Sequence, residues 1–241
     1  MAERFDMTPA SAFVTTTTVD AAERVTAFLR KVYGWMFVGL GITAGVAYAV
    51  AGSPALQRAI FSNQILFIGL ILAEIGLVFF LSARVQRLAP TTAAVLFVAY
   101  SALNGATLSM LLLLYTGASI ASTFVVTAGM FGALALFGTV TRRSLAGVGQ
   151  FAFMGLIGVI LASLVGMFWH SAGLQFGISI VGVIVFTALT AWDAQRLKQW
   201  ATTTTPDGQT GSYAVVGALS LYLDFINLFL FMLRFLGGRR N

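Results

Sequence analysis

Residues 213–236 read YAVVGALSLYLDFINLFLFMLRFL, an almost unbroken apolar run with an aspartate, Asp224, near its middle. A run of this length matches the ~20 residues that an α-helix needs to cross about 30 Å of hydrocarbon. A carboxylate inside a membrane helix is costly, so such a residue is a functional-site hypothesis by default. The stretch therefore predicts a membrane fold and a site within it.

A second acid lies close by in the sequence. The preceding apolar run, residues 173–192, is followed directly by Asp193, within the segment TAWDAQRLK. If both runs cross a membrane, two carboxylates lie in or beside hydrocarbon, and their separation decides what the site can do.

The composition excludes a soluble domain. The chain has 241 residues, of which 59% are hydrophobic and 9% are charged, and its mean hydropathy is +0.91. A soluble domain carries roughly 25% charged residues. The net charge of +6 comes from short basic clusters between apolar runs, which is the positive-inside pattern and not a nucleic-acid surface. With no cysteine, thiol chemistry and cysteine metal sites are also excluded.

Seven apolar runs predict an all-α, polytopic bundle of seven transmembrane helices in a single membrane domain, residues 21–241. We expect residues 1–20 to form a disordered polar tail, and the spacing of Asp20 and Glu23 resembles a capping box that starts the first helix. The predicted spans are 32–51, 62–83, 91–114, 119–140, 149–169, 173–192 and 213–236.

Basic residues predict that the N-terminus is cytoplasmic. Arginines and lysines flank the first span and recur in every second loop, whereas the opposite loops contain little besides Arg58 and His170. Seven full spans would leave the C-terminal Arg239 and Arg240 on the outer side, so a re-entrant last segment is an alternative.

Polar residues inside the spans are candidates for an ion pathway. In the last span Ser220, Asp224 and Asn227 lie at i, i+4 and i+7, which is one helical face. Glu74 lies at mid-depth in the second span, and Asn104 near the middle of the third. Because polar groups in hydrocarbon need partners, these side chains should turn into the bundle. Glu74 also fits a structural carboxyl that is bonded to a neighbouring helix.

Helix lengths permit the two aspartates to meet but do not establish it. With a sixth span ending at residue 192, Asp193 lies at the cytoplasmic end, whereas Asp224 lies some eleven residues into the last span, about 16 Å deeper. Asp193 also fits an interfacial helix-end residue with Arg196 as its partner. If the carboxylates do approach, they cannot both ionise cheaply and so share a proton. Paired carboxylates are also ligands of the kind that calcium uses.

Catalytic signals are weak. The chain has one histidine, His170, on the outer side away from both acids, and it has no serine-hydrolase, zinc-protease or phosphate-loop motif. We expect no enzyme activity and no cofactor. Two glycine pairs, Gly41-xxx-Gly45 and Gly173-xxx-Gly177, predict close helix packing inside the bundle.

Five stretches together resemble the transmembrane Bax-inhibitor-motif family, in particular its bacterial inner-membrane branch. They are NGATLSMLLLLYT (104–116), TFVVTAGMFGA (123–133), FMGLIG (153–158), LTAWDAQRLK (189–198) and LSLYLDFINLFL (219–230). The resemblance covers about residues 20–236. It implies a seven-helix bundle with the last helix near its centre, a pH sensor made of Asp193 and Asp224, and a calcium-leak activity. It also implies that Arg84 latches the sensor and that Glu74 occupies the family's acidic position in the second helix.

These observations predict a pH-sensitive calcium (cation) leak channel or transporter in the bacterial inner membrane, with Asp193 and Asp224 as gate and tentative calcium ligands. The expected partners are the lipid bilayer, calcium and protons. One alternative is a membrane interaction protein that modulates a membrane-embedded protease. A membrane hydrolase is the weaker alternative, because the histidine ligands it needs are missing.

Overall fold

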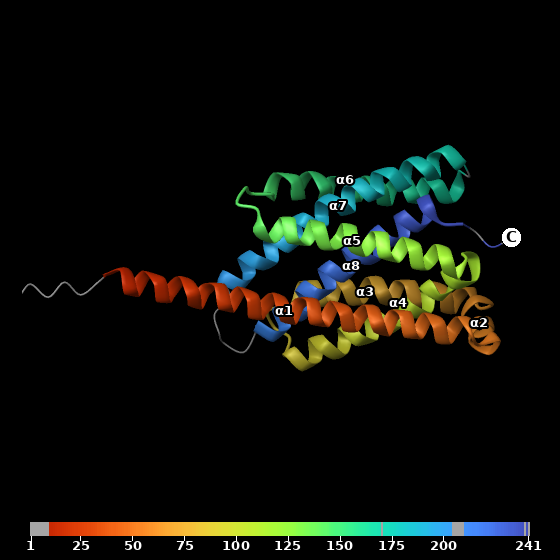
Figure 1. Cartoon of the computed structure of the whole chain (residues 1–241). Helices are drawn as coiled ribbons and strands as arrows, with labels where there is room; N and C mark the ends of the chain where they lie inside the picture. Colours follow the sequence, from red (N-terminus) through yellow and green to blue (C-terminus); the bar gives the residue numbers. More distant parts are fainter. Residues whose placement is uncertain (1–9, 170, 204–209, 239, 241) are drawn as a thin grey trace, which may run out of the picture.

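The computed structural model describes residues 10–169, 171–203, 210–238 and 240, with side chains from residue 22 onward. These residues form helices joined by short turns (Figure 1). The helices are α1 (Ala10–Ala51), α2 (Pro54–Phe61), α3 (Gln64–Arg84), α4 (Pro90–Leu114), α5 (Gly117–Val140), α6 (Ala146–Phe168), α7 (Ala172–Thr203) and α8 (Thr210–Leu236). In this described part seven helices, all except α2, are long and apolar enough to cross a membrane. The prediction of an all-α bundle with seven spans is confirmed.

Most helix boundaries lie within three residues of the predicted spans because local signals mark them. Pro54 and Pro90 occupy the first turns of α2 and α4, where a missing backbone N–H costs nothing. Asn63 accepts hydrogen bonds from the backbone N–H groups of Ile65 and Leu66 and so caps α3.

Two boundaries differ from the prediction. Helix α1 begins at Ala10, so residues 10–20, predicted to be disordered, are helical and Asp20 does not start the helix. Residues 1–9 lie outside the described part of the chain. Helix α7 continues eleven residues past the predicted limit at residue 192, to Thr203. Both extensions are polar continuations of a span, and hydropathy alone does not register them.

Helix α8 is the centre of the bundle, as predicted. It packs against α7, α1, α5 and α4, and most of its side chains are buried (Figure 1). By contrast, α3 and α6 bury few residues and present apolar side chains outward, where lipid would lie. Asp224 therefore lies on the helix that is least exposed to the bilayer.

The last helix runs through the bundle and is long and apolar enough to cross a membrane, which favours a full span over a re-entrant segment. Its C-terminal end lies against the turn between α4 and α5, where the backbone N–H of Thr116 donates to Gly238 (3.2 Å) and that of Arg240 donates to Leu114 (2.9 Å). The start of α1 and the end of α8 consequently lie at opposite ends of the bundle (Figure 1).

Close helix approach depends on two glycines outside the predicted pairs. A Cβ on Gly105 of α4 would lie 2.6 Å from the Thr43 carbonyl of α1, and one on Gly138 of α5 would overlap the Ala191 carbonyl of α7. Gly41, Gly45 and Gly177 have nothing within 4 Å of an added Cβ, and Gly173 would meet only the Ser171 hydroxyl, at 3.8 Å. The predicted packing role of these two glycine pairs is therefore wrong.

Candidate functional site

Asp224 is enclosed by the bundle. Its side chain is 5% exposed, and its Oδ2 atom has no hydrogen-bond partner among the described residues. A buried polar atom without a partner is costly and calls for an explanation such as a bound proton or ion. The predicted burial of this carboxyl in the bundle is thus observed.

Helices α7 and α8 bring Asp193 close to Asp224. A Cβ on Gly217 of α8 would meet Leu197 of α7, and one on Gly182 of α7 would meet Phe231 of α8. Helices α7 and α8 are antiparallel, so seven residues after Gly217 on α8, at Asp224, lie level with seven residues before Leu197 on α7, at residue 190. Asp193 is three residues from that level, which is about 4.5 Å along the helix axis. The two carboxyls are close enough to interact electrostatically.

The extension of α7 removes the depth difference that was expected from span lengths. Asp193 lies ten residues before the end of α7 at Thr203, and Asp224 lies fourteen residues after the start of α8 at Thr210. At 1.5 Å per residue these depths are about 15 Å and about 21 Å, which differ by roughly one helical turn. Asp193 is therefore not a helix-end residue.

Arg196, and not Arg84, is the cation that lies near Asp193. Its charge interacts with Asp193, and its guanidinium lies over the rings of Trp192 (5.4 Å) and Trp200 (4.7 Å). Arg84 is exposed at the end of α3, with its guanidinium 5.6 Å from the Phe80 ring. The structure does not bring Arg84 to the aspartates, and its role as a latch stays a prediction.

Glu74 belongs to a second polar cluster. Asn104 Nδ2 donates to Glu74 Oε2 (3.1 Å) and Thr107 Oγ1 donates to Glu74 Oε1 (2.9 Å), so α4 holds the carboxylate of α3. Tyr222 then donates its hydroxyl to Asn104 Oδ1 (3.0 Å) and also hydrogen-bonds Thr43 Oγ1 (2.6 Å). This arrangement favours the structural interpretation of Glu74 over a place on an open pathway.

Tyr222 and Thr43 were missed by the sequence analysis. Tyr222 is fully buried at the junction of α1, α4 and α8, and Thr43 Oγ1 also lies 2.9 Å from the backbone carbonyl of Ser101, a second acceptor for its proton. The available signal was the tyrosine itself, because a phenol hydroxyl inside an apolar span needs a partner.

The other candidates from the last span lie beside the aspartates without joining them. Ser220 and Asn227 are half-buried. Asn227 donates Nδ2 to the backbone carbonyl of Leu223 (2.8 Å) and faces a groove between α6, α7 and α8.

Unpaired hydroxyls are found in α7, which holds Asp193, and in α5, which packs against both α7 and α8. Besides Asp224 Oδ2, the buried side-chain atoms without a hydrogen-bond partner in the described residues are the hydroxyls of Thr123 and Thr127 in α5 and of Thr187 in α7. Thr127 lies three turns from Gly138, on the face of α5 that packs against α7. The interface of α5, α7 and α8 therefore contains oxygen atoms that could receive a cation or a proton.

Comparison with known proteins agrees with this architecture. A profile of the family described as inhibitor of apoptosis-promoting Bax1 matches residues 25–241. The chain belongs to this Bax inhibitor family.

Several bacterial members of the family are similar over most of their length. The chain is 50% identical over 215 residues to the inner membrane protein YbhL of Escherichia coli, a match that covers 88% of this chain and 92% of that protein. It is 46% identical over 215 residues to a protein of Borreliella burgdorferi (89% and 93% covered). It is 37% identical over 214 residues to a membrane protein of Streptococcus pyogenes (87% and 92% covered).

The seven candidate spans and the family assignment identify a multi-pass membrane protein. The E. coli and S. pyogenes relatives are named as membrane proteins. The expected lack of enzyme activity stays a prediction. In the described residues, no cluster of three or more metal-binding side chains is present.

Proposed function

We propose that this protein is a pH-sensitive cation leak channel of the bacterial inner membrane, with calcium as its cargo and the Asp193–Asp224 pair as its gate. The N-terminus would lie in the cytoplasm, as the basic loops predict. The observation that carries the proposal is the unpaired, buried Oδ2 of Asp224 beside a second carboxyl.

The pair supports gating because its charge state depends on protons. Two neighbouring carboxylates in a low-dielectric interior share one proton, and the shared proton holds α7 against α8. When that proton leaves, two negative charges repel each other across the helix interface. The same two charges attract a divalent cation, so release of the proton both loosens the interface and creates a site for the cargo.

The threonine hydroxyls support a route away from the pair. Calcium takes about six to eight oxygen ligands when it is held tightly. Two carboxyls and scattered hydroxyls offer fewer, which suits an ion in transit. The unpaired oxygens of Thr187, Thr127 and Thr123 lie in helices that contact α8 and can replace part of the hydration shell in steps.

The test is calcium flux from the purified protein in liposomes, across about pH 5 to about pH 8. Wild type is compared with Asp193→Asn and Asp224→Asn, which keep side-chain size but remove the shared proton. Glu23→Gln, at an exposed site on α1, is the matched control because it removes one carboxylate outside the bundle core. We expect a pH-dependent flux in wild type and in the control, and a flux that no longer depends on pH in both asparagine variants.

Two results would contradict the proposal. The absence of calcium flux through the wild-type protein at every pH would refute the channel function. An unchanged pH dependence of the flux in both asparagine variants would refute the role of the aspartate pair as the gate. Co-purification with a membrane protease, together with silence, would instead favour the interaction protein.

The interaction alternative has one observation in its favour. An apolar groove runs between α1 and α5 with Phe225 of α8 at its floor, in two parts of about 400 Å³ and about 320 Å³ that share Leu40 and Phe124. Such a lateral groove suits a transmembrane helix of a partner protein.

A further inference from the structure

A second groove, between α6, α7 and α8, carries polar side chains in an otherwise apolar wall. It has a volume of about 610 Å³ and lies at the end of the bundle where α8 ends. Arg234 in the last turn of α8 and Gln175 in the first turns of α7 mark its mouth, and Ser163 of α6 and Asn227 of α8 lie deeper. Leucine, isoleucine and phenylalanine side chains line the remainder.

The polar groups of this groove are not satisfied by the protein. The Ser163 hydroxyl and the Gln175 side-chain amide make no hydrogen bond among the described residues, and Asn227 uses only its Nδ2 atom. The Arg234 guanidinium contacts only the face of the Phe231 ring, at 5.7 Å. Because hydrocarbon offers no hydrogen bonds, polar groups that face the lipid along this groove can be satisfied by acceptors of a lipid headgroup.

No acidic side chain of the described residues lies near Arg234. Its eight acidic residues include none between residues 75 and 192 and none after Asp224. Asp224 is ten residues away on the same helix, about 15 Å along its axis, and interacts electrostatically with Asp193 of α7. Glu74 is on α3, which does not line the groove, and its carboxylate is held by α4. Arg234 is exposed in the last turn of α8, so its guanidinium is accessible to an anion from outside the protein.

We propose that this groove binds one anionic phospholipid of the leaflet at the C-terminal end of the bundle. The phosphate accepts hydrogen bonds from Arg234 and Gln175, an ester carbonyl of the same lipid accepts from Ser163, and an acyl chain follows the apolar wall along α6. A planar guanidinium suits a phosphate because it can donate two parallel hydrogen bonds. The apolar length of the groove selects a lipid over a soluble phosphate. This inference is independent of the channel proposal.

The experiment measures lipid binding to the purified full chain by native mass spectrometry, with phosphatidylglycerol and phosphatidylcholine as probes. We expect tighter binding of phosphatidylglycerol to wild type, and about tenfold weaker binding to Arg234→Gln, as for the loss of one charge-assisted hydrogen bond. Ser163→Ala should weaken the binding of both lipids to a smaller extent, because it removes a contact to the ester group that both lipids share.

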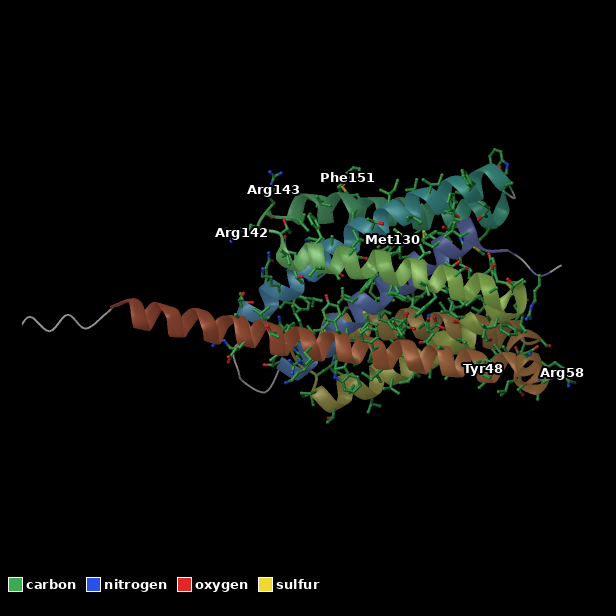
Figure 2. All side chains as sticks on the ribbon, viewed as in Figure 1. Tyr48, Arg58, Met130, Arg142, Arg143 and Phe151 are labelled. Carbon is green, nitrogen blue, oxygen red and sulfur yellow. The ribbon has the colours of Figure 1, made fainter. Side chains whose placement is uncertain are left out.

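Arg58→Gln is the matched control, since it removes one exposed positive charge at the same end of the bundle, away from the groove (Figure 2). It should bind phosphatidylglycerol as wild type does. Equal weakening by Arg58→Gln and Arg234→Gln would overturn the site and leave Arg234 as a general interfacial anchor. An increase of the melting temperature by inorganic phosphate alone, lost in Arg234→Gln, would overturn the lipid assignment in favour of a soluble anion.

Discussion

Replacement of Tyr222 by phenylalanine removes a single oxygen atom from the polar cluster that joins α1, α3, α4 and α8. The phenol hydroxyl donates to Asn104 Oδ1 (3.0 Å) and hydrogen-bonds Thr43 Oγ1 (2.6 Å). The ring contacts survive in the variant, because Phe97 and Tyr100 pack edge-on against the Tyr222 ring with centroids 5.7 Å away in each case. The change therefore isolates the hydroxyl.

The magnitude follows from what the lost hydroxyl leaves behind. Thr43 keeps an acceptor in the Ser101 carbonyl (2.9 Å), but Asn104 Oδ1 loses its donor inside the bundle. An interhelical hydrogen bond in a membrane protein contributes about 0.6 kcal/mol on average and about 1.7 kcal/mol at most. An unsatisfied buried acceptor costs about 1–3 kcal/mol. We expect Tyr222→Phe to lower the free energy of unfolding by about 1–3 kcal/mol.

The assay is equilibrium unfolding in mixed detergent micelles, followed by circular dichroism. Tyr213→Phe is the matched control, since its ring packs on Trp200 and its hydroxyl has no hydrogen-bond partner among the described residues. The control should unfold as wild type does. If the two variants unfold at the same detergent fraction, the cluster around Glu74 does not stabilise the bundle, and the structural interpretation of Glu74 is refuted.

Two further predictions concern close packing and loop anchoring. Gly105→Ala should lower the free energy of unfolding by about 1–3 kcal/mol, the usual cost of overpacking, because its Cβ would lie 2.6 Å from the backbone carbonyl of Thr43. Gly41→Ala is the control, because its Cβ would meet nothing within 4 Å, and it should leave the stability unchanged. Thermal unfolding of the two variants tests this difference. Gln195→Leu should increase the rate at which trypsin cleaves the α5–α6 loop, because the Gln195 side chain hydrogen-bonds two backbone groups of that loop at 2.8 Å each. Gln199→Leu, at an exposed position on the same helix, is the control and should leave the rate of cleavage unchanged.

The α5–α6 loop also shows why the basic clusters between the spans could be identified as loop residues from the sequence. Arg142 and Arg143 extend away from the bundle at the end opposite Arg58 and Tyr48 (Figure 2). The positive-inside rule depends only on which loops of the sequence carry Lys and Arg, so it can be applied without knowing how the helices pack.

Rotation and approach of the helices could not be predicted in the same way. Glu74 and Asn104 were both identified as polar residues within spans, but their hydrogen bond depends on how α3 and α4 turn toward each other. The same holds for glycine, since Gly41 and Gly45 form a Gly-xxx-Gly pair and pack against nothing, whereas Gly105 and Gly138 belong to no such pair and allow two helix contacts. A spacing pattern specifies a face of one helix and does not specify its neighbour.

The aspartate pair illustrates another limit of prediction from sequence, which concerns the length of a helix. Hydropathy ends the sixth span at residue 192, and this places Asp193 at the membrane surface with Asp224 far below it. The helix in fact continues to Thr203, so the two acids differ in depth by about one helical turn. The resemblance implied a pair that the span lengths permitted but did not establish, and the polar end of α7 accounts for the smaller difference in depth.

This geometry also indicates what must move for the pair to act as a gate. Gly217 lies about two turns from Asp224 along α8, and Gly182 lies about three turns from Asp193 along α7. The two glycines are on opposite sides of the pair, and each admits a side chain of the other helix, Leu197 or Phe231. These two contacts set the register of α7 against α8, and a slide of one turn, about 5.4 Å, would separate the carboxyls. Because the interlocked side chains resist sliding, charge repulsion within the pair is relieved more readily by tilting α7 away from α8. The α5 helix packs on α7 through Gly138 and on α8 through Phe131, so a tilt of α7 would open the interface that contains the unpaired threonine hydroxyls.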